Sequence, residues 1–309
     1  MPASHPNAKQ RIRALAAAVL VAGFAPGTPS IAEPPGETKP PREIDAAPAP
    51  KDDAPDSLAP ILEFPGERPH ARRIDDIRAL GDSLSSRQVE RLVAFVRAPT
   101  PEGLGAPRAL HAEKNEILNL LRRQTAHLEA LRDQLLALSR DADADPVIRD
   151  YALQHLASLA LDRDAAEDRR DFEAHVDILD GENPALAATA MIHLLVAQQR
   201  DRLEAVSRAQ LATAARRMAA DPDAPASSRA TALQVVARLG LDDQAPLARE
   251  LAEDPAQPIP LRIAAIAALG DLAPDDPRTR NFLEKTAEGP ERRLRLPAQS
   301  ALNKRKPNP

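Results

Sequence analysis

The stretch PIPLRIAAIAALGDL, residues 258–272, decides the fold of this 309-residue chain. Counted from Arg262, small or aliphatic residues stand three, seven and ten positions on, at Ala265, Leu269 and Leu272. This spacing places them on one face of an α-helix. A proline stands four residues before the arginine, where the first turn of a helix loses little from a missing amide donor. The stretch therefore predicts a helix with a narrow face of alanine and leucine.

The same pattern occurs five times, and we call the residue equivalent to Arg262 the register position. These positions are separated by 38, 42, 33 and 33 residues. Alanine follows each at the third residue, and leucine or valine at the seventh. A proline precedes each by three to five residues. The resulting sets are Arg149, Ala152 and Leu156; Ala187, Ala190 and Leu194; Arg229, Ala232 and Val236; Arg262, Ala265 and Leu269; and Arg295, Ala298 and Leu302.

Second, shorter helices are predicted between these copies. A single helix pair of this size cannot bury its apolar stripe, whereas stacked pairs bury a continuous core. The sequence therefore predicts an all-α fold, an α-solenoid of about six antiparallel helix pairs behind a disordered N-terminal region. Ser85 and Gln88 have the spacing of a capping box at an earlier helix start. The second helices are expected at roughly 164–179, 203–219, 245–253 and 278–287.

This pattern resembles the HEAT-repeat family, in particular exported bacterial proteins with HEAT-repeat domains. Residues 258–272 match it best and 145–159 second; the resemblance covers 145–309, and 71–144 more weakly. It implies paired antiparallel helices in a right-handed superhelix that act mainly as protein-binding scaffolds. Two departures stand out. Ala187 replaces the register arginine, and Pro297 is expected to interrupt the last helix.

The N-terminus has the layout of a secretory signal peptide. Three basic residues precede an uncharged apolar run at 14–25, and Ser30-Ile31-Ala32 follows as a small-residue cleavage site. We expect cleavage of 1–32 between Ala32 and Glu33, and a periplasmic or secreted mature chain. The apolar run is too short to span about 30 Å of hydrocarbon. No later segment approaches 18 consecutive apolar residues, so the mature chain is expected to lack a transmembrane segment.

Composition excludes several classes of function. The chain contains no cysteine, so disulfide and thiolate metal sites are excluded. Removal of 1–32 takes away three basic residues and no acidic ones, which changes the net charge from −5 to −8. Nucleic-acid binding requires clustered positive charge, so no nucleic-acid partner is expected. We expect no cofactor and no metal.

Residues 33–69 are predicted to form an extended linker. They contain ten prolines, nine acidic residues and four basic residues, and proline prevents regular helix or central strand. Leu58, Ile61, Leu62 and Phe64 form a small apolar cluster near its end. It could dock on a partner or on the first helices of the same chain, and we favour the second. Beyond the linker, 70–144 would form a helical cap of degenerate repeats, and 145–306 the HEAT-like repeats.

Motifs for chemistry are nearly absent. There is no Gly-x-Ser-x-Gly and no His-Glu-x-x-His. The run 141–145 imitates the start of a calcium loop, but Pro146 and Ala152 replace its glycine and glutamate. We interpret it as a turn between repeats that ends in an N-cap at Asp145. His155 and His193 share a register offset; they could share a metal or proton, although we favour a packing role. Three further histidines are expected at the surface or at a helix edge: His111, His127 and His175.

The expected function is a non-enzymatic scaffold for a protein or peptide, bound in a polar groove formed by the second helices. The groove candidates are Arg170, Arg208, Arg216 and Arg217. Alternatives are an accessory or maturation factor, a lyase-like enzyme for an exported protein, or an envelope structural element. The C-terminus is basic, through Arg292, Arg293, Arg295, Lys304, Arg305 and Lys306. It could weakly contact the anionic lipid head groups of a membrane surface or an acidic partner, but we favour a solvated end cap that complements the dipole of the last helix.

Overall fold

The computed structural model describes residues 58–62, 69–101, 107–162 and 169–304. All of them belong to the unit 51–309. The predicted cleavage site at Ala32 and Glu33 and most of the linker lie outside the described residues. Within the described residues every regular element is a helix and there is no strand. The predicted all-α class is confirmed.

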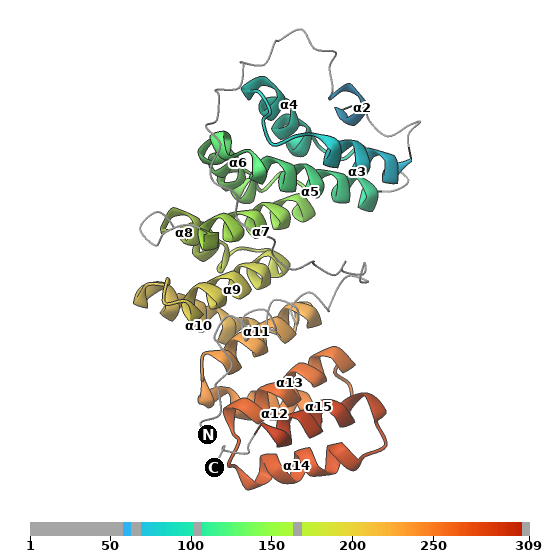
Figure 1. Ribbon diagram of the computed structural model, residues 1–309. Coiled ribbons are helices and arrows are strands. Elements are labelled where there is room, and N and C mark those ends of the chain that lie inside the picture. The colour runs from blue at the N-terminus through green and yellow to red at the C-terminus, as the bar shows by residue number, and fades with distance from the viewer. Residues whose placement is uncertain (1–57, 63–68, 102–106, 163–168, 305–309) are drawn as a thin grey trace, which may run out of the picture. The chain divides into compact units, whose positions relative to one another are not determined.

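The described part contains fourteen α-helices and two short 3₁₀ turns. Figure 1 labels the helices in chain order. Their bounds are α2 Ala59–Leu62, α3 His70–Ala79, α4 Ser86–Arg97, α5 Pro107–Arg123, η1 Thr125–His127, α6 Leu128–Arg140, α7 Pro146–Asp162, α8 Arg169–Ile178, α9 Pro184–Gln199, α10 Ala205–Ala220, α11 Ala226–Arg238, η2 Asp242–Gln244, α12 Ala245–Glu253, α13 Ile259–Leu272, α14 Pro277–Glu288 and α15 Arg292–Asn303.

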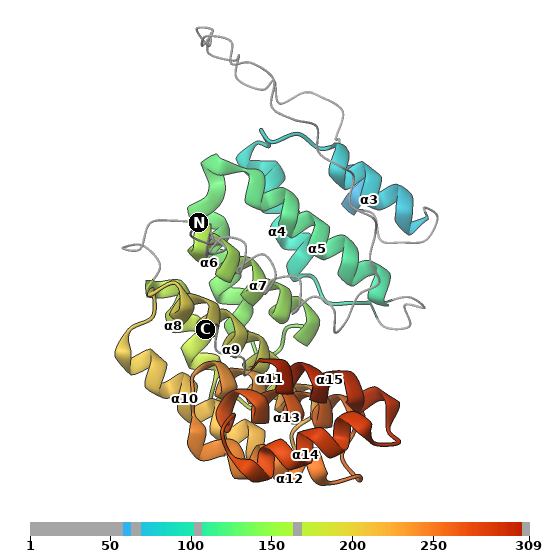
Figure 2. The same cartoon turned by 60° about the horizontal axis from the view of Figure 1, so that its bottom comes forward.

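The odd-numbered helices pack on one another in chain order. Each odd-numbered helix from α3 to α15 contacts the next odd-numbered one, and we call this series the odd row. The even-numbered helices α4, α6, α8 and α10 also contact one another in turn. Successive helices join the two rows, as α10 joins α11 and α14 joins α15 (Figures 1 and 2). The five register copies lie on α7, α9, α11, α13 and α15, all in the odd row.

The residues of the predicted apolar face are buried. The alanine three residues after each register position is completely buried on all five helices. A methyl group is small enough to let neighbouring helices approach closely, and the larger side chain at the seventh residue fills the remaining space. That seventh residue is completely buried on four helices and partly buried at Leu302. At Gly270 the approach is so close that an added Cβ would lie 2.7 Å from Ala301 Cβ.

Each register arginine reaches back to the end of the preceding helix. The Nε–H groups of Arg149, Arg229 and Arg262 donate to the carbonyl oxygens of Ser139, Ala219 and Ala252, at 3.2, 3.3 and 3.2 Å. Each acceptor is the penultimate residue of its helix. Carbonyl groups in the last turn lack a partner within the helix and carry the negative end of its dipole. The arginine therefore satisfies and neutralises this helix end. In the last copy, Arg295 donates to Gly289 O at 2.7 Å.

An aspartate stands eight residues before three of these arginines. Asp141, Asp221 and Asp254 directly follow α6, α10 and α12, and a carboxylate oxygen of each accepts the amide two residues on. Local side-chain bonds of this kind stabilise turns. We call the segments 141–149, 221–229 and 254–262 the corners. The run 141–145 thus forms a turn, and Asp145 accepts the Val147 amide at 2.9 Å, as expected of an N-cap.

The copy without a register arginine has a substitute. At the end of α8, the Leu179 carbonyl accepts from Arg217 Nη2 at 2.7 Å, so an arginine of α10 occupies the role that Ala187 cannot fill. Asn183 caps α9 by accepting the amides of Ala185 and Leu186. The end of this helix pair is therefore satisfied from the following helix rather than from the register position.

Two predictions of detail have different outcomes. The capping box of Ser85 and Gln88 at the start of α4 is confirmed. The expected interruption at Pro297 is wrong, because α15 runs from Arg292 to Asn303 with the proline inside it. Proline at this sixth position removes one intrahelical hydrogen bond. Buried contacts of Leu294, Ala298 and Ala301 hold both sides of the helix against its neighbours.

The register can be tested by Ala265→Asp. The substitution places a charge without a partner in the core, and we expect the free energy of unfolding to fall by about 3 kcal/mol or more. Urea denaturation measures this value. The matched control is Ala267→Asp, at a half-buried position of the same helix. Equal losses for both variants would contradict the assigned register.

The role of the register arginine can be tested by Arg229→Met. The variant keeps the aliphatic packing but leaves the Ala219 carbonyl without its donor, so we expect a loss of about 1–3 kcal/mol in the free energy of unfolding. Arg208→Met changes an exposed arginine of α10 and should stay within about 0.5 kcal/mol of the parent. A parent-like Arg229→Met protein would show that this bond contributes nothing to stability.

Candidate functional site

The predicted groove arginines divide into different environments. Arg216 forms two hydrogen bonds with Asp243, both 3.0 Å long, and these bonds lower the pKa of Asp243 to about 2. Arg217 bonds to Asp180 at 2.8 Å as well as to the Leu179 carbonyl. Both arginines thus tie α10 to neighbouring segments. Arg208 is exposed on the same helix, and the side chain of Arg170 lies outside the described part.

The odd row carries a line of uncharged residues that the register locates. Five residues after the register position stand Gln154, Ile192, Gln234 and Ala267, on α7, α9, α11 and α13. The two glutamines are exposed, and Ile192 and Ala267 are half-buried. We call these four residues the amide line. Because consecutive odd helices pack together, the line runs from one helix to the next. Its signal in the sequence is this constant offset from the register position.

The structure gives His155 and His193 separate partners. His155 on α7 bonds through Nε2 to Asn115 Oδ1 on α5, at 3.0 Å. His193 on α9 instead meets His175 of α8, with Nδ1 3.2 Å from His175 Nε2. The same His175 nitrogen also lies 3.2 Å from the Leu153 carbonyl, so it carries the proton and His193 Nδ1 accepts. These histidines join neighbouring helices.

Burial keeps the side chains of His155 and His193 neutral at ordinary pH. Burial, and secondarily the positive charge of Arg122, lowers the pKa of His155 to about 3. Burial, with His175 beside it, lowers the pKa of His193 to about 3. The expectation that His175 lies at the surface is wrong, because its side chain is completely buried between α7, α8 and α9. The buried Phe172, one turn earlier on the same helix, is the sequence signal that could have indicated this burial.

A second polar cluster joins the end of α4 to the start of α7. The buried Lys114 ammonium donates to the Ala98 carbonyl. His111 Nε2 lies 2.7 Å from Asp145 Oδ2, and Thr100 donates to the same oxygen at 3.2 Å. Burial lowers the pKa of Lys114, an effect opposed by the charge of Asp145. A buried amine with a lowered pKa is a group that catalysis uses, but here the amine is completely buried and donates to the backbone of the protein itself.

The end of the predicted linker is part of the folded body. Leu58 and Ile61 are buried in the same core cluster as Ile77 of α3. Arg73 on α3, also buried, donates to the Ile61 carbonyl and to Glu113 Oε2, both at 2.8 Å. The expected docking of the apolar cluster on its own chain is thus confirmed for Leu58 and Ile61. Phe64 lies outside the described residues.

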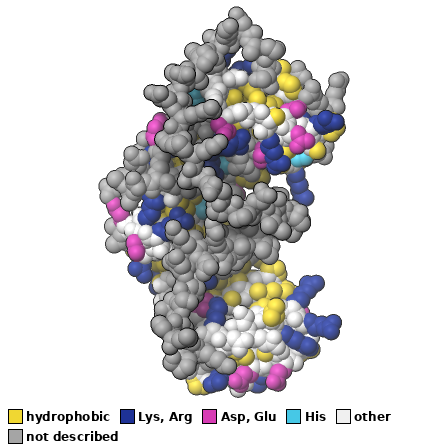
Figure 3. Space-filling view, in the orientation of Figure 1, with side chains coloured by type: hydrophobic (Ala, Val, Ile, Leu, Met, Phe, Trp, Pro, Cys, Tyr) yellow, Lys and Arg dark blue, Asp and Glu magenta, His cyan; other side chains and the backbone are white. Residues whose placement is uncertain are grey.

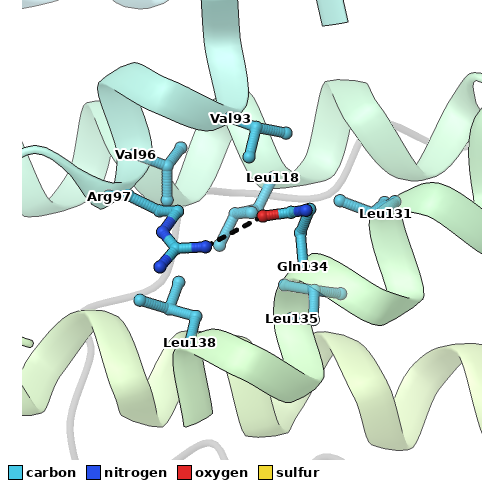
Figure 4. A pocket seen from close by; sticks show the side chains of 8 residues that line it. All are labelled: Val93, Val96, Arg97, Leu118, Leu131, Gln134, Leu135 and Leu138. Carbon is cyan, nitrogen blue, oxygen red and sulfur yellow. Dashed lines mark hydrogen bonds between the residues drawn. The ribbon is translucent and has the colours of Figure 1, made fainter. Parts of the chain in front are cut away.

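A small, open pocket lies between α4, α5 and α6. Figure 4 shows its lining, which is apolar except for Arg97 and Gln134. Arg97 Nη1 donates to Gln134 Oε1 at 2.9 Å. Because these two polar side chains bind each other, the pocket offers mainly apolar contact. The lining residues are Val93, Val96, Arg97, Leu118, Leu131, Gln134, Leu135 and Leu138.

Basic side chains gather over the C-terminal helices in the view of Figure 3. Of the predicted set, Lys304 pairs with Asp271 at 2.9 Å and Arg295 binds the Gly289 carbonyl. Arg292 and Arg293 are exposed. The remaining two, Arg305 and Lys306, lie beyond the described residues. The C-terminal charge thus consists of an internally paired part and an exposed part.

Across 58–62, 69–101, 107–162 and 169–304, no three His, Asp or Glu side chains form a group that could hold a metal ion. None of the helices in these ranges combines the length and the hydropathy needed to cross a bilayer.

The buried histidines predict a loss of stability in acid. The ordinary histidine pKa is 6.5, whereas that of His155 in the folded protein is about 3, so the unfolded chain binds a proton first as the pH falls. The stabilisation is complete above pH 6.5 and is lost between pH 6.5 and 3. At about pH 5 the loss from this one residue is about 2 kcal/mol.

Urea denaturation at about pH 7.5 and about pH 5 measures the loss. His155→Gln removes the titration while retaining a polar side chain, so its stability should depend less steeply on pH. If His155→Gln and the parent lose the same stability between the two pH values, His155 does not contribute to the acid sensitivity.

Compared with known proteins, the sequence matches no protein-family model and no curated protein.

Proposed function

We propose that residues 70–304 form an α-solenoid of HEAT-like antiparallel helix pairs that binds another protein or a peptide along an extended surface. The supporting observation is the odd row, in which each helix from α3 to α15 packs on the next. Such a series presents equivalent positions of successive helices side by side, which suits an extended ligand. We further propose that the chain is exported, and that it acts as a scaffold rather than as an enzyme.

We assign the binding surface to the odd row rather than to the second helices. Arg216 and Arg217 on α10 are engaged by Asp243, Asp180 and the Leu179 carbonyl. Their use for a ligand would require breaking bonds that tie α10 to its neighbours. Gln154 and Gln234 of the amide line are exposed, and the bond from Gln154 Nε2 to Asp150 Oδ2, 2.8 Å long, lies within α7 and does not tie the helix to a neighbour.

The chemistry of the amide line fits an extended peptide. A glutamine side chain offers both a donor and an acceptor, and the backbone of a peptide presents both groups. Half-buried Ile192 lies on the helix between the two glutamines and supplies apolar contact. Affinity would be spread over several modest contacts, with a few anchors contributing most of it. An accessory or maturation factor for an exported protein would work by the same binding.

The cluster around Lys114 supports a non-enzymatic function. A nucleophilic amine must reach its substrate, but the Lys114 side chain is completely buried and donates to the Ala98 carbonyl. Asp145 in turn accepts from Thr100 and from the backbone of α7. These bonds connect the end of α4, α5 and the start of α7, so the cluster has a structural explanation.

A photo-crosslinking amino acid introduced at Gln234 tests the assigned surface. In cells of the source organism, we expect a reproducible crosslink to one protein partner from Gln234 on α11. The matched control is the same amino acid at Gln210, an exposed glutamine of the neighbouring even-numbered helix α10. No partner from either position would contradict the scaffold function. A partner from Gln210 alone would place binding on the second helices.

A further inference from the structure

We propose that the outer face of α15 docks on an anionic membrane surface. The face comprises Arg292, Arg293 and Leu296, and is distinct from the amide line. Because the two surfaces consist of different residues, lipid docking does not depend on the scaffold function.

Burial along α15 separates two sides of the helix. Leu294, Ala298 and Ala301 are buried and pack into the core with α13. Leu296 stands off this stripe and is 72% exposed. The only other large hydrophobic residue exposed in the described ranges is Val147, at 38%. Arg292 precedes Leu296 by one helical turn, so the two side chains are neighbours on the helix surface.

Two nearby acidic groups are paired with basic residues outside this face, so the face itself stays positively charged. Glu291 lies 3.6 Å from Arg262, and Asp271 binds Lys304 through both of its oxygens at 2.9 Å. Glu288 on α14 is exposed and remains as an opposing charge. Arg292 and Arg293 are exposed beside Leu296. The chain as a whole has a net charge of −5, so an anionic surface repels the average face and attracts this one.

The combination of residues favours lipid over an acidic protein. Guanidinium groups bind phosphate in a planar, two-pronged manner. A leucine side chain between them can enter the acyl boundary just below the headgroups, as in interfacial helices. An acidic protein surface would satisfy the two arginines but would leave this leucine in contact with charged groups. Each basic residue near an anionic membrane increases binding about five-fold, so the docking is weak and reversible.

The absence of cysteine allows a local measurement on the full chain. Leu296→Cys, labelled with an environment-sensitive fluorophore, reports entry into the bilayer boundary at that position only. The matched control is labelled Ser86→Cys, at an exposed position of α4. Binding by the apolar N-terminal run affects bulk sedimentation but does not by itself move the fluorophore on α15. The probes are vesicles of phosphatidylcholine alone and of phosphatidylcholine mixed with phosphatidylglycerol.

We expect a blue shift of the label on α15 with mixed vesicles, little shift with phosphatidylcholine alone, and none from the label on α4. The apparent affinity should fall more than ten-fold with Arg292→Gln/Arg293→Gln, by about five-fold for each charge. It should also fall as salt rises from about 0.1 M to about 1 M, which shortens the Debye length from about 10 Å to about 3 Å. Arg72→Gln/Arg87→Gln removes the same charge from exposed positions of α3 and α4 and should change the affinity less than two-fold.

Three results would overturn the proposal. The first is an unchanged emission of the α15 label with mixed vesicles, and the second is an equal loss of affinity for the two arginine pairs. The third is a shift produced by poly-glutamate but not by mixed vesicles, which would assign the face to an acidic polypeptide. Gln234 crosslinking that persists in Arg292→Gln/Arg293→Gln would keep the scaffold function separate from membrane docking.

Discussion

The whole helical array depends on one short contact, the approach of neighbouring odd-numbered helices over a buried alanine. Ala152, Ala190, Ala232, Ala265 and Ala298 occupy equivalent positions and are all completely buried. A larger side chain there would push the helices apart and open the core that the leucine and valine residues fill. Between α13 and α15 even a methyl group is too large, which explains Gly270 opposite Ala301. The low aromatic content is consistent with this packing, because a close approach favours small side chains over rings at these positions.

The corners determine how the chain passes from one packed helix to the next. An aspartate forms the turn, a proline starts the next helix, and an arginine returns to the carbonyl of the helix just completed. All three contacts join residues within about ten positions, so the geometry of each corner is set locally. Function then uses what the packing leaves over: uncharged side chains on the odd row and the basic, leucine-bearing face of α15. The proposed scaffold and membrane surfaces both consist of side chains that the same helix packing leaves exposed.

The sequence predicted the helices well because the period of their apolar residues is a direct consequence of burial. The register alanines and the second helices from 203 onward lie within a few residues of their expected positions. Pro297 was misjudged because a single missing hydrogen bond is outweighed by burial on both sides of it. Side-chain partners were harder. Nothing local reveals that Arg217 replaces the missing register arginine or that His175 meets His193, since these contacts join separate helices. The aspartate of the corners can be recognised in the sequence, but only once the copies are aligned on the register arginine.

The corner from Asp254 to Arg262 repeats the corner from Asp221 to Arg229 after 33 residues. Each arginine donates to a carbonyl ten residues earlier, on the penultimate residue of the preceding helix, and each buried alanine faces an equivalent helix. If a genetic deletion removed residues 229–261, Arg262 would inherit both the corner and the carbonyl that Arg229 now holds. The chain can therefore change length in whole units while every junction keeps its chemistry. A shorter or longer descendant of this protein would differ in the reach of its surface and not in its manner of folding.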